Sequence, residues 1–118
     1  MILTLGDSFT YGEELTYPLV HAWPALLGQM FDLPAVNRAK PGGSNDMMFR
    51  LAVTLTSREK FDLVIIAWSD PSRFETKVNK DITCVNSNRT SPAWIKQYYQ
   101  EGYSDELAHV QWFTNMFN

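Results

Sequence analysis

The residue best suited to chemistry is Ser8, which follows an apolar run that ends at Leu5. A serine just past a buried strand can direct its hydroxyl at a carbonyl carbon, while backbone N–H groups of the turn stabilise the oxyanion that forms. Asp7 and Ser8 are also ordinary turn residues, and they could simply cap the turn. Two interpretations of Ser8 therefore stay open: it is a nucleophile, or it caps a turn together with Asp7.

Two further polar segments, residues 41–45 and 68–71, each follow a later strand of the predicted sheet. The carboxyl ends of parallel strands meet at one edge, and open α/β sheets bind their ligands at that edge. Both segments should therefore converge in space with Ser8, although they are distant from it in the sequence.

The hydrophobic pattern predicts an α/β domain with a parallel sheet and right-handed crossovers. Four consecutive aliphatic residues within 61–67 are typical of a central strand. Residues 75–79 and 81–85 either pair as a small hairpin or form an excursion over the sheet. Further helices are expected from Ser91 and from Ser104. The other expected elements are strands at residues 1–5 and 35–37, a helix at residues 21–31, and a second helix that follows the turn at residues 41–45, has its first apolar position at Met47 and ends at about Arg58.

Composition limits the classes of function. The chain has 118 residues, enough for one ordinary domain, and a net charge of -3 with its 10 basic residues scattered, so nucleic acid is not an expected partner. The single cysteine, Cys84, forms neither an intramolecular disulfide nor a zinc cage and is expected to be a small, semi-buried residue. No signal peptide and no apolar run of about 20 residues is evident. We expect a cytoplasmic protein, or part of a particle assembled in a cell, with no membrane partner.

Residues 6–12, Gly-Asp-Ser-Phe-Thr-Tyr-Gly, resemble the first sequence block of the SGNH, or GDSL, hydrolases. The resemblance implies a flavodoxin-like three-layer α/β/α fold and an ester hydrolase that needs no cofactor or metal. It implies that Ser8 is the nucleophile and that the N–H of a glycine after the second strand, Gly43 in preference to Gly42, binds the oxyanion. At the third block Ser69 stands where the family has an asparagine. The expected site comprises Ser8, Gly43, Ser69 and Asp7 as catalytic residues and Asn45, Trp68, Asp70 and Arg73 as substrate-binding residues.

The general base remains unassigned. The fourth motif of that family, Asp-x-x-His, is not found, because Asp105 and His109 are one residue too far apart and fall in a predicted helix. His21, at the start of a helix, is no better candidate. With only three strands and an apolar ending, the chain is expected to be the amino-terminal portion of a longer domain.

Two classes of function follow. The first is a serine esterase acting on a small-molecule or carbohydrate ester. The second is a non-catalytic module that binds carbohydrate or serves as a structural or assembly protein of a virus particle, with virion or homo-oligomer contacts. Residues 22–24 and 68–75 also resemble SGNH-like proteins of tailed bacteriophages, in which Arg73 and Glu75 would form a buried pair or contact substrate. A surface ion pair is the simpler alternative for these two residues.

Overall fold

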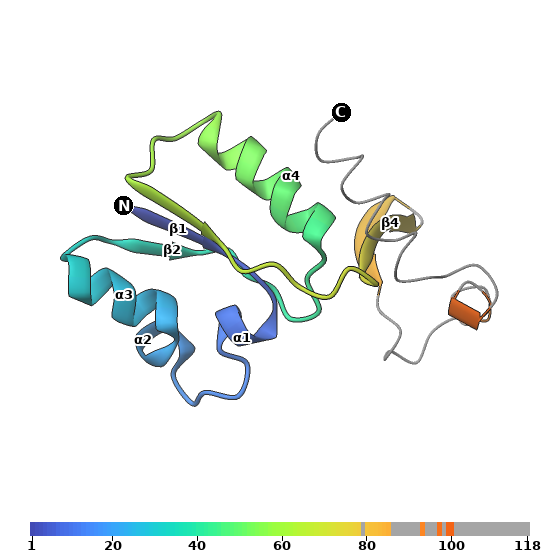
Figure 1. Ribbon diagram of the computed structural model, residues 1–118, viewed down its shortest axis with the longest axis horizontal. Helices are drawn as coiled ribbons and strands as arrows, with labels where there is room; N and C mark the ends of the chain where they lie inside the picture. Colours follow the sequence, from blue (N-terminus) through green and yellow to red (C-terminus); the bar gives the residue numbers. More distant parts are fainter. Residues whose placement is uncertain (79, 86–92, 94–96, 98, 101–118) are drawn as a thin grey trace.

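A parallel three-stranded sheet organises the chain (Figure 1). The computed structural model describes residues 1–78 and 80–85 together with Ala93, Gln97, Tyr99 and Gln100. The strands are β1 (Ile2–Leu5), β2 (Ala35–Asn37) and β3 (Leu63–Ile66), in the spatial order β2-β1-β3. Every residue of β1 is buried, as its uninterrupted apolar run predicts for a strand covered on both faces.

Helices cover both faces of this sheet. In Figure 1, α4 (Asn45–Thr56) lies on one face, and α2 (Pro18–His21) and α3 (Trp23–Phe31) lie on the other. The sequence sets the boundaries of these helices. Ser44 caps α4 by accepting a hydrogen bond from the backbone N–H of Met47 at 3.3 Å, and Pro24 sits in the first turn of α3, where its missing N–H costs nothing.

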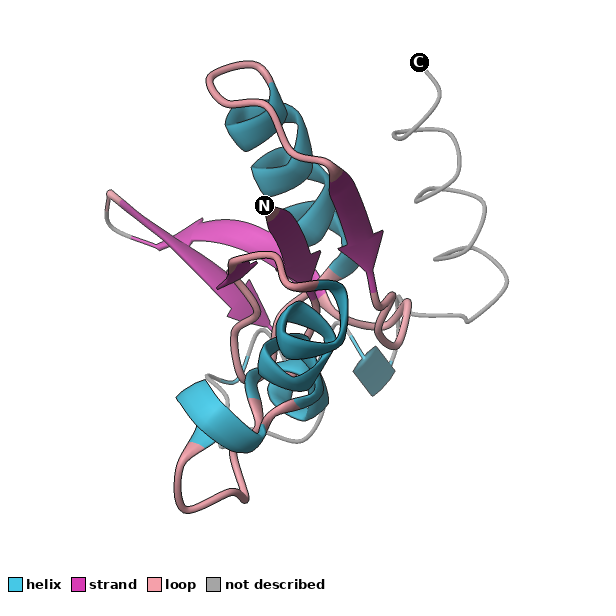
Figure 2. Cartoon of the chain, turned by 90° about the vertical axis from the view of Figure 1, so that its left-hand side faces the viewer, coloured by secondary structure: helices cyan, strands magenta, loops and turns pink. Residues whose placement is uncertain are grey.

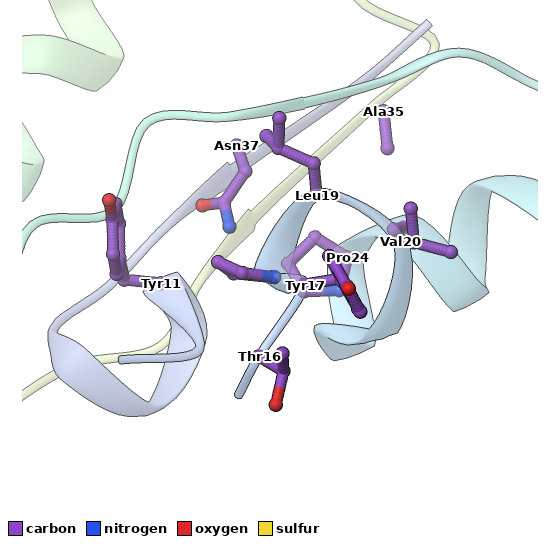
Figure 3. Close-up of a pocket in the computed structure, with 10 residues that line it drawn as sticks. Tyr11, Thr16, Tyr17, Leu19, Val20, Pro24, Ala35 and Asn37 are labelled. Carbon is purple, nitrogen blue, oxygen red and sulfur yellow. The ribbon is translucent and has the colours of Figure 1, made fainter. Parts of the chain in front are cut away.

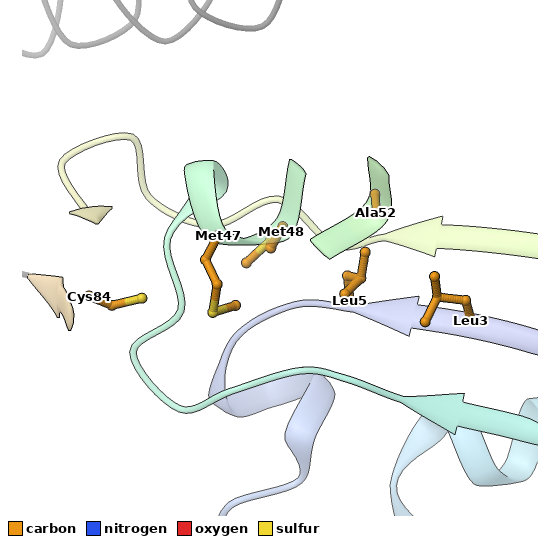
Figure 4. Close-up of a cluster of buried hydrophobic side chains, with 6 residues drawn as sticks. All are labelled: Leu3, Leu5, Met47, Met48, Ala52 and Cys84. Carbon is orange, nitrogen blue, oxygen red and sulfur yellow. The ribbon is translucent and has the colours of Figure 1, made fainter. Parts of the chain in front are cut away.

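The hydrophobic core lies between the sheet and α4 (Figure 4). Leu3 and Leu5 of β1 face Met48 of α4, and all three side chains are completely buried. Cys84 joins this cluster at 7% exposure, with its Sγ 3.8 Å from the Ser44 hydroxyl, so it is more deeply buried than the semi-buried position expected from the sequence. Because side chains alternate along a strand, Ile2 and Thr4 of β1 project to the opposite face, toward α2 and α3.

An antiparallel hairpin follows the parallel sheet (Figure 2). Its strands are β4 (Phe74–Val78) and β5 (Asp81–Val85), so the hairpin alternative for this segment is confirmed. Two contacts tie β4 to α4. The Arg50 guanidinium donates to both carboxylate oxygens of Glu75 at 2.7 and 3.0 Å, and the backbone N–H of Glu75 donates to the Asp46 carboxylate at 3.2 Å.

The structure corrects three parts of the predicted fold. Within the described residues β3 pairs only with β1, so it borders the sheet instead of lying at its centre, and Leu63 is 40% exposed. A four-residue helix, α1 (Ser8–Tyr11), replaces the start of the expected polar loop, and α2 precedes α3 as a separate turn. Three parallel strands and one hairpin define a mixed α/β fold, and by themselves they do not define a flavodoxin-like sheet.

The helices expected from Ser91 and Ser104 lie outside the described residues. Among the helices that the structure describes, none is both long and apolar enough to cross a membrane.

Candidate active site at the carboxyl edge of the parallel sheet

The loops after the three parallel strands converge at one edge of the sheet, as the sequence predicts. The backbone N–H of Lys40 donates to the Gly6 carbonyl at 3.1 Å, which joins the loop after β2 to the loop after β1. The N–H of Ala67 donates to the Leu5 carbonyl at 2.9 Å and brings in the loop after β3. The loops after β1 and β2 are also closely packed. A Cβ atom on Gly43 would lie only 3.0 Å from the Gly6 carbonyl oxygen, so a larger residue would not fit there without a shift.

Ser8 is the first residue of α1 and is half-buried. Gly6 allows this sharp turn from strand to helix, since a Cβ atom there would overlap the Thr10 side chain. Neither the backbone N–H nor the Oγ of Ser8 makes a hydrogen bond with any residue that the structure describes. Ser8 therefore offers one donor and one hydroxyl at the edge of the sheet. It lines a small hollow of about 260 Å³ together with Phe9, Gly12, Glu13, Glu14 and Leu15.

Asp7 caps α1, so the capping interpretation of this residue is confirmed. One of its carboxylate oxygens accepts the Phe9 N–H at 3.1 Å, and the other accepts Nη1 of Arg73 at 3.0 Å. The same Nη1 donates to Oγ of Ser69 at 2.7 Å. The side chains of Arg73 and Asp7 are only 22% and 16% exposed. This Asp7–Arg73–Ser69 network ties the loop after β1 to the loop after β3, and it occupies the guanidinium group that we expected to bind substrate.

Asn45 is also engaged within the protein. Its Nδ2 donates to the Ser69 carbonyl at 3.0 Å, and its Oδ1 accepts the Ser69 N–H at 2.7 Å. The residue is 4% exposed. Its amide therefore holds the loop after β3 in place through both of its polar atoms.

Three other residues of the expected site have distinct environments. Gly43 is buried and its N–H donates to the Lys40 carbonyl at 2.8 Å, so this N–H is committed to the turn instead of to an oxyanion. The Asp70 carboxylate accepts the Ser72 N–H at 2.8 Å and stabilises the turn before β4. Trp68 follows β3 at this edge and is 44% exposed.

Arg73 and Glu75 do not pair with each other, contrary to one sequence-based alternative. Arg73 turns to Asp7, whereas Glu75 forms its two-point ion pair with Arg50. Burial raises the pKa of Asp46, the charge of Glu75 raises it further, and the hydrogen bond from the Glu75 N–H opposes both effects. Asp46, Glu75 and Arg50 therefore form one group of interacting charges between α4 and β4.

A larger hollow, not predicted from the sequence, of about 520 Å³ lies between β2, α2 and the start of α3 (Figure 3). Tyr11 and Asn37 stand at one end of it, and Val20 and Ala35 stand at the other. Nδ2 of Asn37 donates to the Thr10 carbonyl at 2.8 Å, which connects this hollow to α1.

The histidines do not complete a triad in the described part of the chain. His109 lies outside the described residues, and His21 packs edge-on against the Tyr17 ring with 6.1 Å between centroids. No group of three or more His, Cys, Asp or Glu side chains suited to a metal ion occurs among the residues that the structure describes.

The fold and the edge define a mixed α/β protein with a serine presented after its first strand. Residues 9–112 match a family of unknown function, DUF6071, and the chain belongs to that family. No curated protein and no solved structure matches the chain. The SGNH identity inferred from residues 6–12 is therefore wrong, since the family match is to DUF6071 and none is to an SGNH or GDSL family. An Asp-Ser pair directly after a strand is also common where no hydrolase is present, because these side chains cap the helix or turn that follows. Asp7 caps α1 in this way.

Proposed function

We propose that this protein is a serine ester hydrolase in which Ser8 is the nucleophile. The observation that carries the proposal is the contrast between Ser8 and its neighbours. The Asp7–Arg73–Ser69 network and the Asn45 amide fix the loops on both sides, whereas the N–H and Oγ of Ser8 make no hydrogen bond within the described residues. A fixed frame around an unengaged hydroxyl suits a reacting group, because preorganised neighbours need not rearrange during the reaction.

In the proposed reaction Oγ of Ser8 attacks the acyl carbon of the ester. The negative charge that develops on the carbonyl oxygen is stabilised by the Ser8 N–H and by the Ser69 hydroxyl, which accepts from Arg73 and keeps its own proton to donate. The bond to the alcohol then breaks, and the alcohol leaves with the proton taken from Ser8. Water attacks the acyl-serine, releases the acid and restores the hydroxyl.

The proton needs an acceptor within reach of Ser8. Glu13 and Glu14 line the same hollow as Ser8, and the Glu13 N–H donates to the Ser8 carbonyl at 3.1 Å, so the proposal assigns the base to one of these two carboxylates. The pH profile of the reaction tests this assignment. A carboxylate base and an imidazole base lose their proton-accepting form in different pH ranges, the carboxylate at the more acidic one. Loss of activity in His109→Gln with full activity in Glu13→Gln and Glu14→Gln would transfer the role to His109.

The experiment is covalent labelling with a fluorophosphonate, which reacts with activated serines. Wild type and Ser57→Ala should be labelled, whereas Ser8→Ala should not. Ser57 is the matched control because it is an exposed serine at the end of α4 whose Oγ donates to the Thr54 carbonyl. Hydrolysis of p-nitrophenyl acetate should be lost in Ser8→Ala alone. Equal labelling of wild type and Ser8→Ala would refute the proposal.

The proposal includes a flavodoxin-like three-layer arrangement, in which the three parallel strands form part of a larger doubly wound sheet. This arrangement is supported by the helices on both faces and by the exposure of Leu63 on β3. An additional strand beside β3 would cover that residue.

The second candidate is a non-catalytic binding module. Two contacts between loops favour it: Arg73 donates to Asp7, and Asn45 donates to the Ser69 carbonyl. Side chains that only hold the loops together would make contacts of this kind. The same labelling experiment separates the two, because a wild-type protein that is not labelled at all would support this candidate.

A further inference from the structure

We infer that the hollow between β2, α2 and α3, here called the acyl cleft, takes the uncharged, apolar acyl group of the ester that Ser8 attacks. This inference rests on the proposed function and adds a substrate class to it. The acyl cleft is lined by Tyr11, Thr16, Tyr17, Pro18, Leu19, Val20, Pro24, Ala25, Ala35 and Asn37.

The sheet itself places the acyl cleft on the face opposite α4. Val36 packs against the core beneath α4, and since side chains alternate along a strand, Ala35 and Asn37 on either side of it point the other way. There they meet α2 and the first turn of α3. The cleft volume of about 520 Å³ falls within the range of roughly 300–1,000 Å³ that is usual for small-molecule sites.

The acyl cleft is polar at the end near Ser8 and apolar at the other end. Tyr11 is the last residue of α1 and Ser8 is the first, and side chains three residues apart on a helix are neighbours with Cβ atoms about 5–6 Å apart. Tyr11 and Asn37 mark this polar end, and Val20 and Ala35 mark the apolar end (Figure 3). An ester held with its carbonyl at Ser8 would therefore direct its acyl chain from the polar end toward the apolar end.

Thr4 adds a polar group next to that end. It lies opposite Asn37 in the strand register, so both side chains project to the same face of the sheet. Its hydroxyl is completely buried and has no hydrogen-bond partner within the described residues. This hydroxyl adds a polar group to the sheet next to Asn37, on the face that the acyl cleft occupies.

The charges around the acyl cleft exclude an anionic acyl group. No lysine or arginine is among the described residues that line it, so a carboxylate or phosphate would have no counter-charge. Glu13 and Glu14 line the hollow that contains Ser8 and would repel an anion there. An uncharged acyl chain needs no counter-charge in the cleft and is not repelled by the two glutamates. A chain longer than acetyl would also reach the apolar end of the cleft.

The test compares kcat/KM for p-nitrophenyl acetate with kcat/KM for p-nitrophenyl butyrate. Each buried methylene raises the rate constant about four-fold, so the two additional methylenes of butyrate should give a ratio of about fifteen in the wild type. Ala25→Trp, which fills the acyl cleft, should lower this ratio to about one. Leu19→Asp should lower it too, and because Leu19 is 92% exposed the substitution leaves the core intact. Val53→Trp, an exposed position on α4 outside the cleft, is the matched control and should keep the wild-type ratio.

The outcomes distinguish this inference from the function on which it rests. If the wild type is labelled at Ser8 but has a butyrate-to-acetate ratio of kcat/KM near one, the acyl cleft is refuted and the assignment of Ser8 as the nucleophile is retained. An unchanged ratio in both Ala25→Trp and Leu19→Asp would overturn it as well. A protein that is not labelled at Ser8 would overturn both proposals together.

Discussion

Breaking the Asp7–Arg73 ion pair should destabilise the fold by an amount that its burial predicts. An exposed ion pair contributes up to about 1 kcal/mol, whereas removal of one partner of a fully buried pair costs about 3–5 kcal/mol. The two side chains are 16% and 22% exposed and their charged atoms are 3.0 Å apart, so this pair lies between the two limits. Arg73→Gln should therefore lower the free energy of unfolding by about 2 kcal/mol, because it leaves the Asp7 carboxylate without its partner.

A double-mutant cycle isolates the interaction of these charges. Asp7→Asn removes the charge but keeps an oxygen that can accept the Phe9 N–H, so the helix cap survives. The double variant Asp7→Asn/Arg73→Gln should lose about 1–2 kcal/mol less than the sum of the single variants, as measured by urea-induced unfolding. Arg38→Gln, at an exposed position, is the control and should change the stability by less than about 0.5 kcal/mol. Losses that simply add would show that the pair carries no coupling and would refute the reasoning.

Three further predictions concern stability. Met48→Ala should lower the free energy of unfolding by about 2–5 kcal/mol because Met48 is completely buried, whereas Met30→Ala, at 81% exposure, should change it by less than about 0.5 kcal/mol in the same urea titration. Thr4→Val should raise the melting temperature or leave it unchanged, since it removes a buried hydroxyl that has no partner among the described residues, and a clear fall would reveal a hydrogen bond to that hydroxyl. The raised pKa of Asp46 means that the folded state holds this proton more tightly than the unfolded state does, so between the ordinary value of 3.8 and the higher folded value the stability should fall as the pH rises. Asp46→Asn should remove that part of the pH dependence from thermal unfolding curves, and an identical slope in variant and wild type would contradict the assignment.

The elements with strong local patterns were predictable from the sequence. The β1 run, the β2 strand at residues 35–37 and the helix that becomes α4 are confirmed, because continuous or periodic apolar residues report directly on burial. The predicted central position of β3 is not observed within the described residues, because four aliphatic residues show that a strand is apolar, whereas its place in the sheet depends on which strands pair with it. The four-residue α1 was missed because a single turn has no helical periodicity to detect.

The contacts of the candidate site were less predictable than its location. The pairing of Asp7 with Arg73 joins residues 66 positions apart, and no spacing rule links residues at that separation. The clasp between Asn45 and the backbone of Ser69 likewise joins two loops and has no local signal. The carboxyl edge itself followed from strand order and parallel pairing alone, because these two properties determine where the loops after the strands lie.

The position of β1 also has a consequence for how the protein folds. This strand is central to the parallel sheet of the described residues, yet it precedes both of its neighbours in the chain. Ile2 pairs with Ala35 on one side and with Leu63 on the other, and both partners are synthesised later. During synthesis the backbone groups on the β3 side of β1 stay unpaired while about sixty residues emerge, and pairings between such distant residues are slow because a long loop must close first. Throughout that interval the strand that is completely buried in the folded protein is open to association with other chains. Because Ser8 follows β1 directly, the edge that presents it is assembled only when β3 has docked.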